Sequence, residues 1–172
     1  MRTHSHASIP THHSLCWPVT YFGAIVFSNL LMLWLPMMPL AGTAIPPAII
    51  AFGFVFVLRD FAQRAIGHSV LLFMAAAALA TFFLAGPEIA SASVTAFVIS
   101  ELADWVAFTV LRSSLRRRML ISSLISIPVD TAVFFLALGI LDVHSLVVGV
   151  SVKMIATIAI WLYLTVRGEV RP

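Results

Sequence analysis

Two carboxylates lie in an otherwise apolar stretch of the chain. The segment SASVTAFVISELADWVAFTV, residues 91–110, is apolar enough to cross a membrane, yet it carries Glu101 and Asp104 near its middle. A carboxylate in the hydrocarbon of a bilayer is costly, so it is retained there mainly for function. The two acids are three residues apart and therefore share one face of a helix. The pattern predicts a polar site inside a membrane-spanning bundle.

Further polar residues occur in four other apolar segments. From a helical rise of ~1.5 Å per residue, the depths from the cytoplasmic end are ~10 Å for Asp60 and Asp104, ~15 Å for Glu101, ~16 Å for Asp130, ~18 Å for Asn29 and ~20 Å for Lys153. The hydrocarbon core is ~30 Å thick, so these side chains gather around its midplane. The expected substrate-binding residues, all lining one cavity, are Asn29, Asp60, Gln63, Glu101, Asp104, Asp130 and Lys153. Taken alone, Asn29 and Gln63 are more often contacts between helices than ligand contacts.

The arginines near Asp60 are expected to play different roles. Asp60 and Arg64 are four residues apart, so they can pair along one helix, with Gln63 beside them. Arg59 is expected to extend to the cytoplasmic interface.

The remaining buried charges do not balance. Glu101, Asp104 and Asp130 carry three negative charges against the one positive charge of Lys153, the only lysine. The surplus must be protonated, neutralised by a bound cation, or matched by a ligand that donates hydrogen bonds. Each of these options indicates a site and none fits an inert bundle.

The composition is that of an integral membrane protein. Of the 172 residues, 61% are hydrophobic and 10% are charged, with a mean hydropathy of +1.06. The pattern predicts an all-α protein with six transmembrane helices at about 17–35, 44–66, 69–86, 89–111, 119–140 and 145–166. Residues 1–16 are expected to form a disordered polar tail, 17–166 the transmembrane domain and 167–172 a cytoplasmic tail. With Cys16 as the only cysteine, the chain has no intrachain disulfide and no C-x-x-C metal site.

The arginines predict the orientation. All nine lie on one side of the expected spans, so both termini are expected in the cytoplasm of a bacterial cell, with the chain in the inner membrane. The basic RSSLRRR link is interpreted as a topology anchor among anionic lipids rather than a nucleic-acid site. The second and fifth spans each carry a proline and an aspartate, which suggests an inverted three-plus-three repeat.

Five short blocks carry a resemblance to a known family. They are FSNLL with Ser28 and Asn29, FVFVLRDFAQRAIG with Asp60 and Gly67, SASVTAFVISELADWVAF with Glu101 and Asp104, SIPVDTAVFF with Asp130 and Phe134, and SVKMIATI with Lys153. In this order they resemble the queuosine precursor transporters, also called the vitamin uptake transporter (VUT) family. The chain departs from the family in its short outer links, which leave little or no lid, and in Pro128, which precedes Asp130 and is expected to kink its helix.

The resemblance implies a transporter rather than an enzyme, without cofactor or bound metal. The implied substrate is a deazaguanine such as 7-cyano-7-deazaguanine or 7-aminomethyl-7-deazaguanine. Its ring presents two parallel donors that one carboxylate can accept at once, and Glu101 is the expected acceptor. Lys153, Asn29 or Gln63 can donate to the ring carbonyl. A second carboxylate is available for a coupling proton or cation, and the choice between monomer and homodimer is left open.

Two other functions compete with this interpretation. One is the substrate-binding subunit of an energy-coupling-factor vitamin importer, which is also a small six-span protein and requires ATPase partners. The other is an intramembrane enzyme that acts on a lipid through Asp60, Glu101 and Asp104. The sequence disfavours the enzyme, because it contains no H-E-x-x-H, G-x-S-x-G or phosphate-binding Gly-rich motif.

Overall fold

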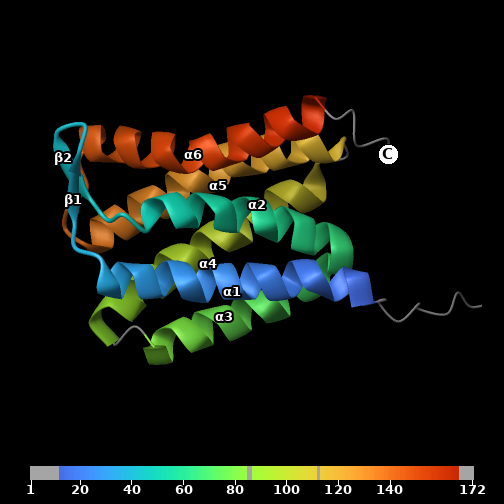
Figure 1. Cartoon of the computed structure of the whole chain (residues 1–172), viewed down its shortest axis with the longest axis horizontal. Coiled ribbons are helices and arrows are strands. Elements are labelled where there is room, and N and C mark those ends of the chain that lie inside the picture. The colour runs from blue at the N-terminus through green and yellow to red at the C-terminus, as the bar shows by residue number, and fades with distance from the viewer. Residues whose placement is uncertain (1–11, 85–86, 112, 167–172) are drawn as a thin grey trace, which may run out of the picture.

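The computed structural model describes residues 12–84, 87–111 and 113–166, and their helices run side by side along the long axis of the molecule (Figure 1). The six α-helices within these residues are α1 (His12–Trp34), α2 (Ile49–Ile66), α3 (Val70–Leu84), α4 (Pro87–Val110), α5 (Leu115–Ala137) and α6 (Val143–Val166). A short 3-10 helix, η1 (Gly67–Ser69), joins α2 to α3. The start of α1 and the end of α6 lie at the same end of the bundle (Figure 1).

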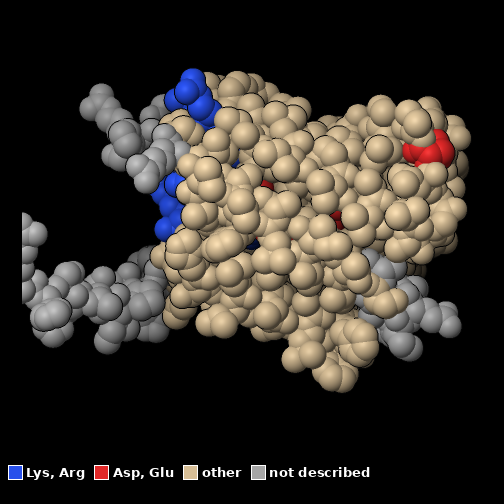
Figure 2. Space-filling view, turned by 180° about the vertical axis from the view of Figure 1, so that it is seen from behind, with Lys and Arg blue, Asp and Glu red and all other residues tan. Residues whose placement is uncertain are grey.

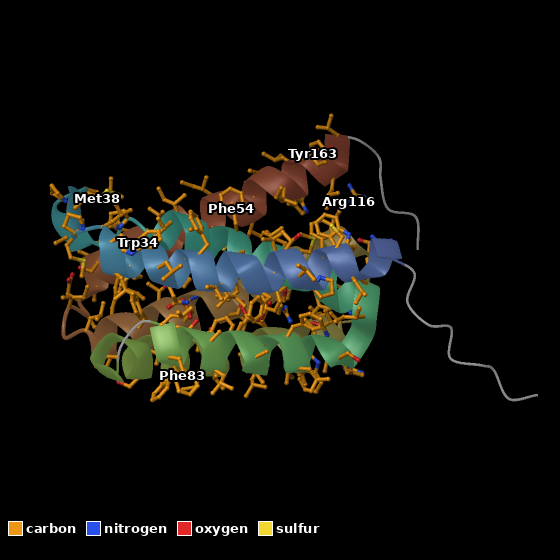
Figure 3. All side chains as sticks on the ribbon, turned by 60° about the horizontal axis from the view of Figure 1, so that its bottom comes forward. Trp34, Met38, Phe54, Phe83, Arg116 and Tyr163 are labelled. Atoms are coloured by element: carbon orange, nitrogen blue, oxygen red, sulfur yellow. The ribbon has the colours of Figure 1, made fainter. Side chains whose placement is uncertain are left out.

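The helices have the apolar character of membrane spans. Within the described residues, 4 stretches are long and apolar enough to cross a membrane: Leu15–Trp34, Ile49–Leu84, Leu115–Ala137 and Val143–Val166. The second of these joins α2 to α3, and α4 is not among them. On the outside, Phe54 and Phe83 are 46% and 76% exposed and point away from the bundle (Figure 3). The all-α membrane class is thus supported, while six spans and the inverted repeat stay predictions.

The link between α1 and α2 forms a small hairpin that the sequence did not predict. Strands β1 (Met38–Leu40) and β2 (Thr43–Ile45) pair antiparallel. At the turn, Ala41 and Gly42 have φ angles of 51° and 85°, the left-handed conformation that tight hairpins require. The link between α1 and α2, which the sequence analysis expects on the outer side, therefore contains regular structure.

The helix boundaries differ most from the expected ones at three N-terminal ends, of which that of α5 lies at Leu115 rather than at residue 119. α2 begins at Ile49 rather than at residue 44, because two prolines precede it and proline fits only the first turn of a helix. Its expected stop is confirmed: Gly67 caps the helix with a φ of 61°. α1 begins at His12 rather than at residue 17, and residues 1–11 of the expected tail lie outside the described part of the chain.

Two glycines let α6 approach its neighbours closely. A Cβ atom on Gly53 of α2 would lie 2.8 Å from the carbonyl oxygen of Lys153, and one on Gly149 of α6 would lie 2.8 Å from Cγ2 of Thr131 in α5. Only a residue without a side chain fits such contacts. α6 is thereby held against α2 at the level of its buried lysine.

Candidate functional site

Arg59 of α2 lies at the centre of a buried acidic cluster. Its Nη2 atom is 2.6 Å from Oδ1 of Asp60 and also donates to Oδ2 of Asp104. Its Nε atom lies 3.8 Å from Oε2 of Glu101, and its Nη1 atom donates to Oε1 of Gln63 at 2.8 Å. None of these four ionisable residues is more than 1% exposed. We call Arg59, Asp60, Glu101 and Asp104 the Arg59 cluster.

The acids of this cluster have unused hydrogen-bonding capacity. Tyr21 of α1 donates its hydroxyl to Oε2 of Glu101 at 2.7 Å. Within the described residues, Oε1 of Glu101, Oδ2 of Asp60 and Oδ1 of Asp104 are buried without a hydrogen-bond partner. Three carboxylates around one guanidinium leave two uncompensated negative charges when all are ionised. The cluster is therefore suited to receive protons or a ligand that donates hydrogen bonds.

The expected pairing of Asp60 with Arg64 is wrong. Asp60 pairs with Arg59, which is 1% exposed instead of extending to the interface, while Arg64 is exposed one turn further along α2. The buried positions of α2 include the row Val55, Arg59 and Ala62 beside the row Phe56, Asp60 and Gln63. Arg59 thus belongs to the buried face, which the four-residue spacing rule does not reveal.

A second polar group joins α4, α5 and α6. Nζ of Lys153 donates to Oδ2 of Asp130 at 2.5 Å, and the Ser100 hydroxyl donates to Oδ1 at 2.9 Å. Lys153 is 1% exposed and Asp130 is 8% exposed. Here one cation faces one carboxylate, and both carboxylate oxygens have partners. We call these two residues the Lys153–Asp130 pair.

A small cavity adjoins this pair. Its lining consists of Phe52, Ala96, Phe97, Asp130, Phe134 and Lys153, and its volume is about 10 Å³. Such a volume has room for about one water molecule. The Nζ atom of Lys153 lies 5.8 Å from the centre of the Phe52 ring. Aromatic faces thus surround the pair, but the helices must separate before a bicyclic ring can enter.

The two predicted amides have different surroundings. Gln63 is in the cluster, where its Nε2 donates to Thr109 of α4 at 3.0 Å in addition to its contact with Arg59. Asn29 is buried, and its Nδ2 donates to the carbonyl oxygen of Ile25 in its own helix at 2.9 Å. The structure therefore gathers four predicted residues around Arg59 and pairs two others, while Asn29 contacts its own helix.

Several polar residues of the site were missed from the sequence. Tyr21, Ile25 and Asn29 follow one another at four-residue spacing, which marks the buried face of α1 and could have indicated Tyr21. Ser100 directly precedes Glu101 and serves Asp130 instead. On α5, the fully buried Ser122 was also missed; it lies one turn before Ser126, which the sequence already places one turn before Asp130.

Side chains also close one end of the bundle. Nε of Arg118 donates to the carbonyl oxygen of Phe108 at 2.9 Å, and its guanidinium carbon is 3.8 Å from the centre of the Phe108 ring. The guanidinium carbon of Arg59 is 5.6 Å from the same ring centre. Phe108 thus connects the buried cluster with the end of the bundle where Arg116 and Tyr163 lie (Figure 3).

The opposite end is closed by the hairpin. The hydroxyls of Thr43 and Ser145 are 2.5 Å apart, and Nε2 of His144 is 2.6 Å from the carbonyl oxygen of Ala41. Figure 2 shows that Lys and Arg side chains gather at the end away from this hairpin, whereas most of the visible face between the two ends carries no charge. Side-chain contacts between elements of the fold thus lie at both ends of the bundle, with the buried polar groups between them.

A metal site does not account for the acids. Within the described residues, no group of three or more His, Cys, Asp or Glu side chains is arranged to hold a metal ion. The centre of the acidic cluster is occupied by the guanidinium of Arg59.

Comparison with known proteins gives one match. The model of a family described as "Putative vitamin uptake transporter" matches residues 19–166. This range covers the Arg59 cluster and the Lys153–Asp130 pair. Neither the curated proteins nor the solved structures give a match to the chain.

Proposed function

Because the chain belongs to the vitamin uptake transporter family, we propose that it imports a queuosine precursor, 7-cyano-7-deazaguanine or 7-aminomethyl-7-deazaguanine. The family and the apolar helices make it a multi-pass membrane protein of the transporter type. The bacterial inner membrane is the proposed location, with the arginine-rich end in the cytoplasm.

The free oxygen of Glu101 is the observation that carries the choice of substrate. A guanine-like ring offers a ring N–H and an exocyclic amine side by side, and one carboxylate accepts both. Among the described residues, Oε1 of Glu101 has no hydrogen-bond partner, and Oε2 accepts a hydrogen bond only from the Tyr21 hydroxyl. A carboxylate oxygen has two lone pairs, so Oε2 can accept a second donor. Glu101 can therefore receive both ring donors.

The Lys153–Asp130 pair supplies the complementary contacts. The lysine can donate to the ring carbonyl, and the phenylalanines beside it can cover the faces of the ring. Ser100 connects the two groups, because it donates to Asp130 and is the neighbour of Glu101 in α4. A substrate ring bound between the Arg59 cluster and the Lys153–Asp130 pair therefore contacts both groups.

Closure at both ends supports alternating access. The contact of Phe108 with Arg118 covers the cytoplasmic end, and the hairpin contacts with α6 cover the outer end. Uptake then requires the hairpin end to open while the Phe108 end stays closed. The hairpin end must then close before the Phe108 end opens.

The experiment uses cells that cannot synthesise the precursor, supplied with limiting amounts from outside. We expect the parent protein to restore queuosine-modified tRNA. Glu101→Gln turns one acceptor into a donor, and a loss of about 2 kcal/mol corresponds to roughly 30-fold slower uptake. Asp142→Asn, in the link before α6, is the control. Parental uptake by Glu101→Gln at normal protein levels would contradict the role of Glu101.

Purified protein in liposomes separates this proposal from an energy-coupling-factor subunit. We expect labelled precursor to cross the membrane without other proteins. Transport that appears only when ATPase subunits are added would identify the chain as the substrate-binding subunit of such an importer.

Cysteine labelling tests the orientation. In a Cys16→Ala background, Met37→Cys lies in the link before the hairpin and Ser114→Cys lies before α5. An impermeant thiol reagent on whole cells should label Met37→Cys only. The reverse pattern would place the arginine-rich end outside.

A further inference from the structure

Two acids of the Arg59 cluster share a single nitrogen atom. Oδ1 of Asp60 lies 2.6 Å from Nη2 of Arg59, and Oδ2 of Asp104 contacts the same Nη2. Two carboxylates on one nitrogen are close enough to repel each other, and such a couple favours the binding of one proton. We propose that Asp60 and Asp104 together bind the proton that drives uptake, an inference that rests on the transport function proposed above.

Proton binding fits this position better than a metal cation does. A sodium ion needs several oxygen atoms around one point, whereas these oxygens surround a guanidinium. Each aspartate also retains one buried oxygen without a hydrogen-bond partner, Oδ2 of Asp60 and Oδ1 of Asp104. A proton on either oxygen removes one negative charge without displacing Arg59.

The charges on the neighbouring helices do not replace this proton. The titratable groups around the couple are Tyr21 of α1, Arg59 of α2, His68 of η1, Glu101 of α4, Arg118 and Asp130 of α5, and Lys153 of α6; α3 contains none. Lys153 and Asp130 compensate each other. Arg118 is partly exposed and contacts Phe108. Arg118 also attracts the carboxylate of Asp60 from a distance. Arg59 is thus the buried cation that contacts Asp60, Asp104 and Glu101 directly.

The arrangement couples the proton to the substrate through Arg59. While both aspartates are ionised, they compete with Glu101 for the guanidinium. A proton on the couple weakens this competition, so more of the positive charge of Arg59, whose Nε is 3.8 Å from Oε2 of Glu101, stabilises Glu101 in its ionised form without a hydrogen bond to it. Proton binding on the outer side therefore prepares the acceptor for the ring, and release to the cytoplasm favours substrate release.

Infrared spectroscopy on the purified protein without substrate tests the proton site directly. We expect the C=O stretch of a protonated carboxylic acid near neutral pH. Either Asp60→Asn or Asp104→Asn should remove this band, because the remaining carboxylate then pairs with Arg59. Asp130→Asn should leave it unchanged. Absence of the band in the folded parent, or its survival in both folded aspartate variants, would overturn the proposal. Size-exclusion profiles identify the variants that are folded.

Transport in liposomes tests the coupling, with 7-cyano-7-deazaguanine as the probe. One proton per substrate corresponds to about tenfold accumulation per unit of pH gradient. A protonophore should abolish this accumulation, and Asp104→Asn should lose the stimulation by the gradient. Accumulation driven by a sodium gradient, or unchanged stimulation in Asp104→Asn, would overturn the coupling. If the parent does not exchange the probe at all, the proposed substrate fails, and the infrared band still decides whether the proton site exists.

Discussion

In the Arg59 cluster one guanidinium serves three carboxylates, whereas Lys153 faces the single carboxylate of Asp130. Both groups are buried, and they lie on neighbouring helices. The pair is electrically balanced and has a partner for each carboxylate oxygen, while the cluster leaves three oxygens free. The balanced group can fix geometry, and the unbalanced group can change its charge.

The largest effect is expected from removing the shared cation. Arg59→Met leaves three acids without a counter-charge, and breaking a buried ion pair costs about 3–5 kcal/mol. Lys153→Met should cost less, because one proton on Asp130 restores neutrality and Ser100 still donates to it. The stability of both variants is measured by thermal unfolding in detergent. Arg59→Lys is the control, because it retains the positive charge. Equal losses for Arg59→Met and Lys153→Met would remove the distinction between the two groups.

A double substitution sharpens the comparison. Adding Asp130→Asn to Lys153→Met removes both members of a balanced pair, so we expect recovery of about 1–3 kcal/mol relative to additive behaviour. Adding Asp60→Asn to Arg59→Met should recover less, because Glu101 and Asp104 remain without a cation. If both double-mutant cycles recovered the same stability, the Arg59 cluster would behave as a simple ion pair.

A smaller effect is expected from packing at the pair. Gly53→Ala places a Cβ against the backbone of Lys153, and such overpacking typically costs about 1–3 kcal/mol. Gly23→Ala is the matched control, because nothing lies within 4 Å of a Cβ at that position. Thermal unfolding of the two variants should differ, and uptake should fall only for Gly53→Ala. Similar behaviour would show that α2 and α6 can separate without loss.

The smallest effect is expected far from both groups. Asp142 accepts hydrogen bonds from the side chain and backbone of Ser145, and these lower the pKa of Asp142. Because the pKa of Asp142 is lower in the folded protein, Asp142 stabilises the fold at pH values above the ordinary pKa of an aspartate. This stabilisation is lost as the pH falls through the folded pKa. Asp142→Asn should keep the cap at all pH values, and Asp142→Ala should be less stable at neutral pH. A parent whose acid unfolding matches that of Asp142→Ala at every pH would contradict this.

The sequence predicted the class of the fold and most of the residues that form the two buried polar groups, because acids in apolar helices are conspicuous. It did not predict how they pair. Arg59 and Arg64 are alike in sequence, and only the packing of α2 against its neighbours decides that Arg59 is inside. Tyr21 was missed because its spacing with Ile25 and Asn29 indicates a buried face of α1 but does not indicate a polar contact with another helix. The hairpin was missed because its strands of 3 residues are too short for a periodic signal.

In the transport cycle proposed above, the hairpin also has a consequence for the substrate affinity measured from outside the cell. Its contacts with α6, Thr43 with Ser145 and Ala41 with His144, must break before the outer end opens. If the two contacts together favour the closed state by about 1–2 kcal/mol, the open state is populated roughly 5–30-fold less than the closed one. The apparent dissociation constant rises by the same factor. In this cycle, the strength of the hairpin contacts changes the substrate affinity, without any change to the residues proposed to contact the ring.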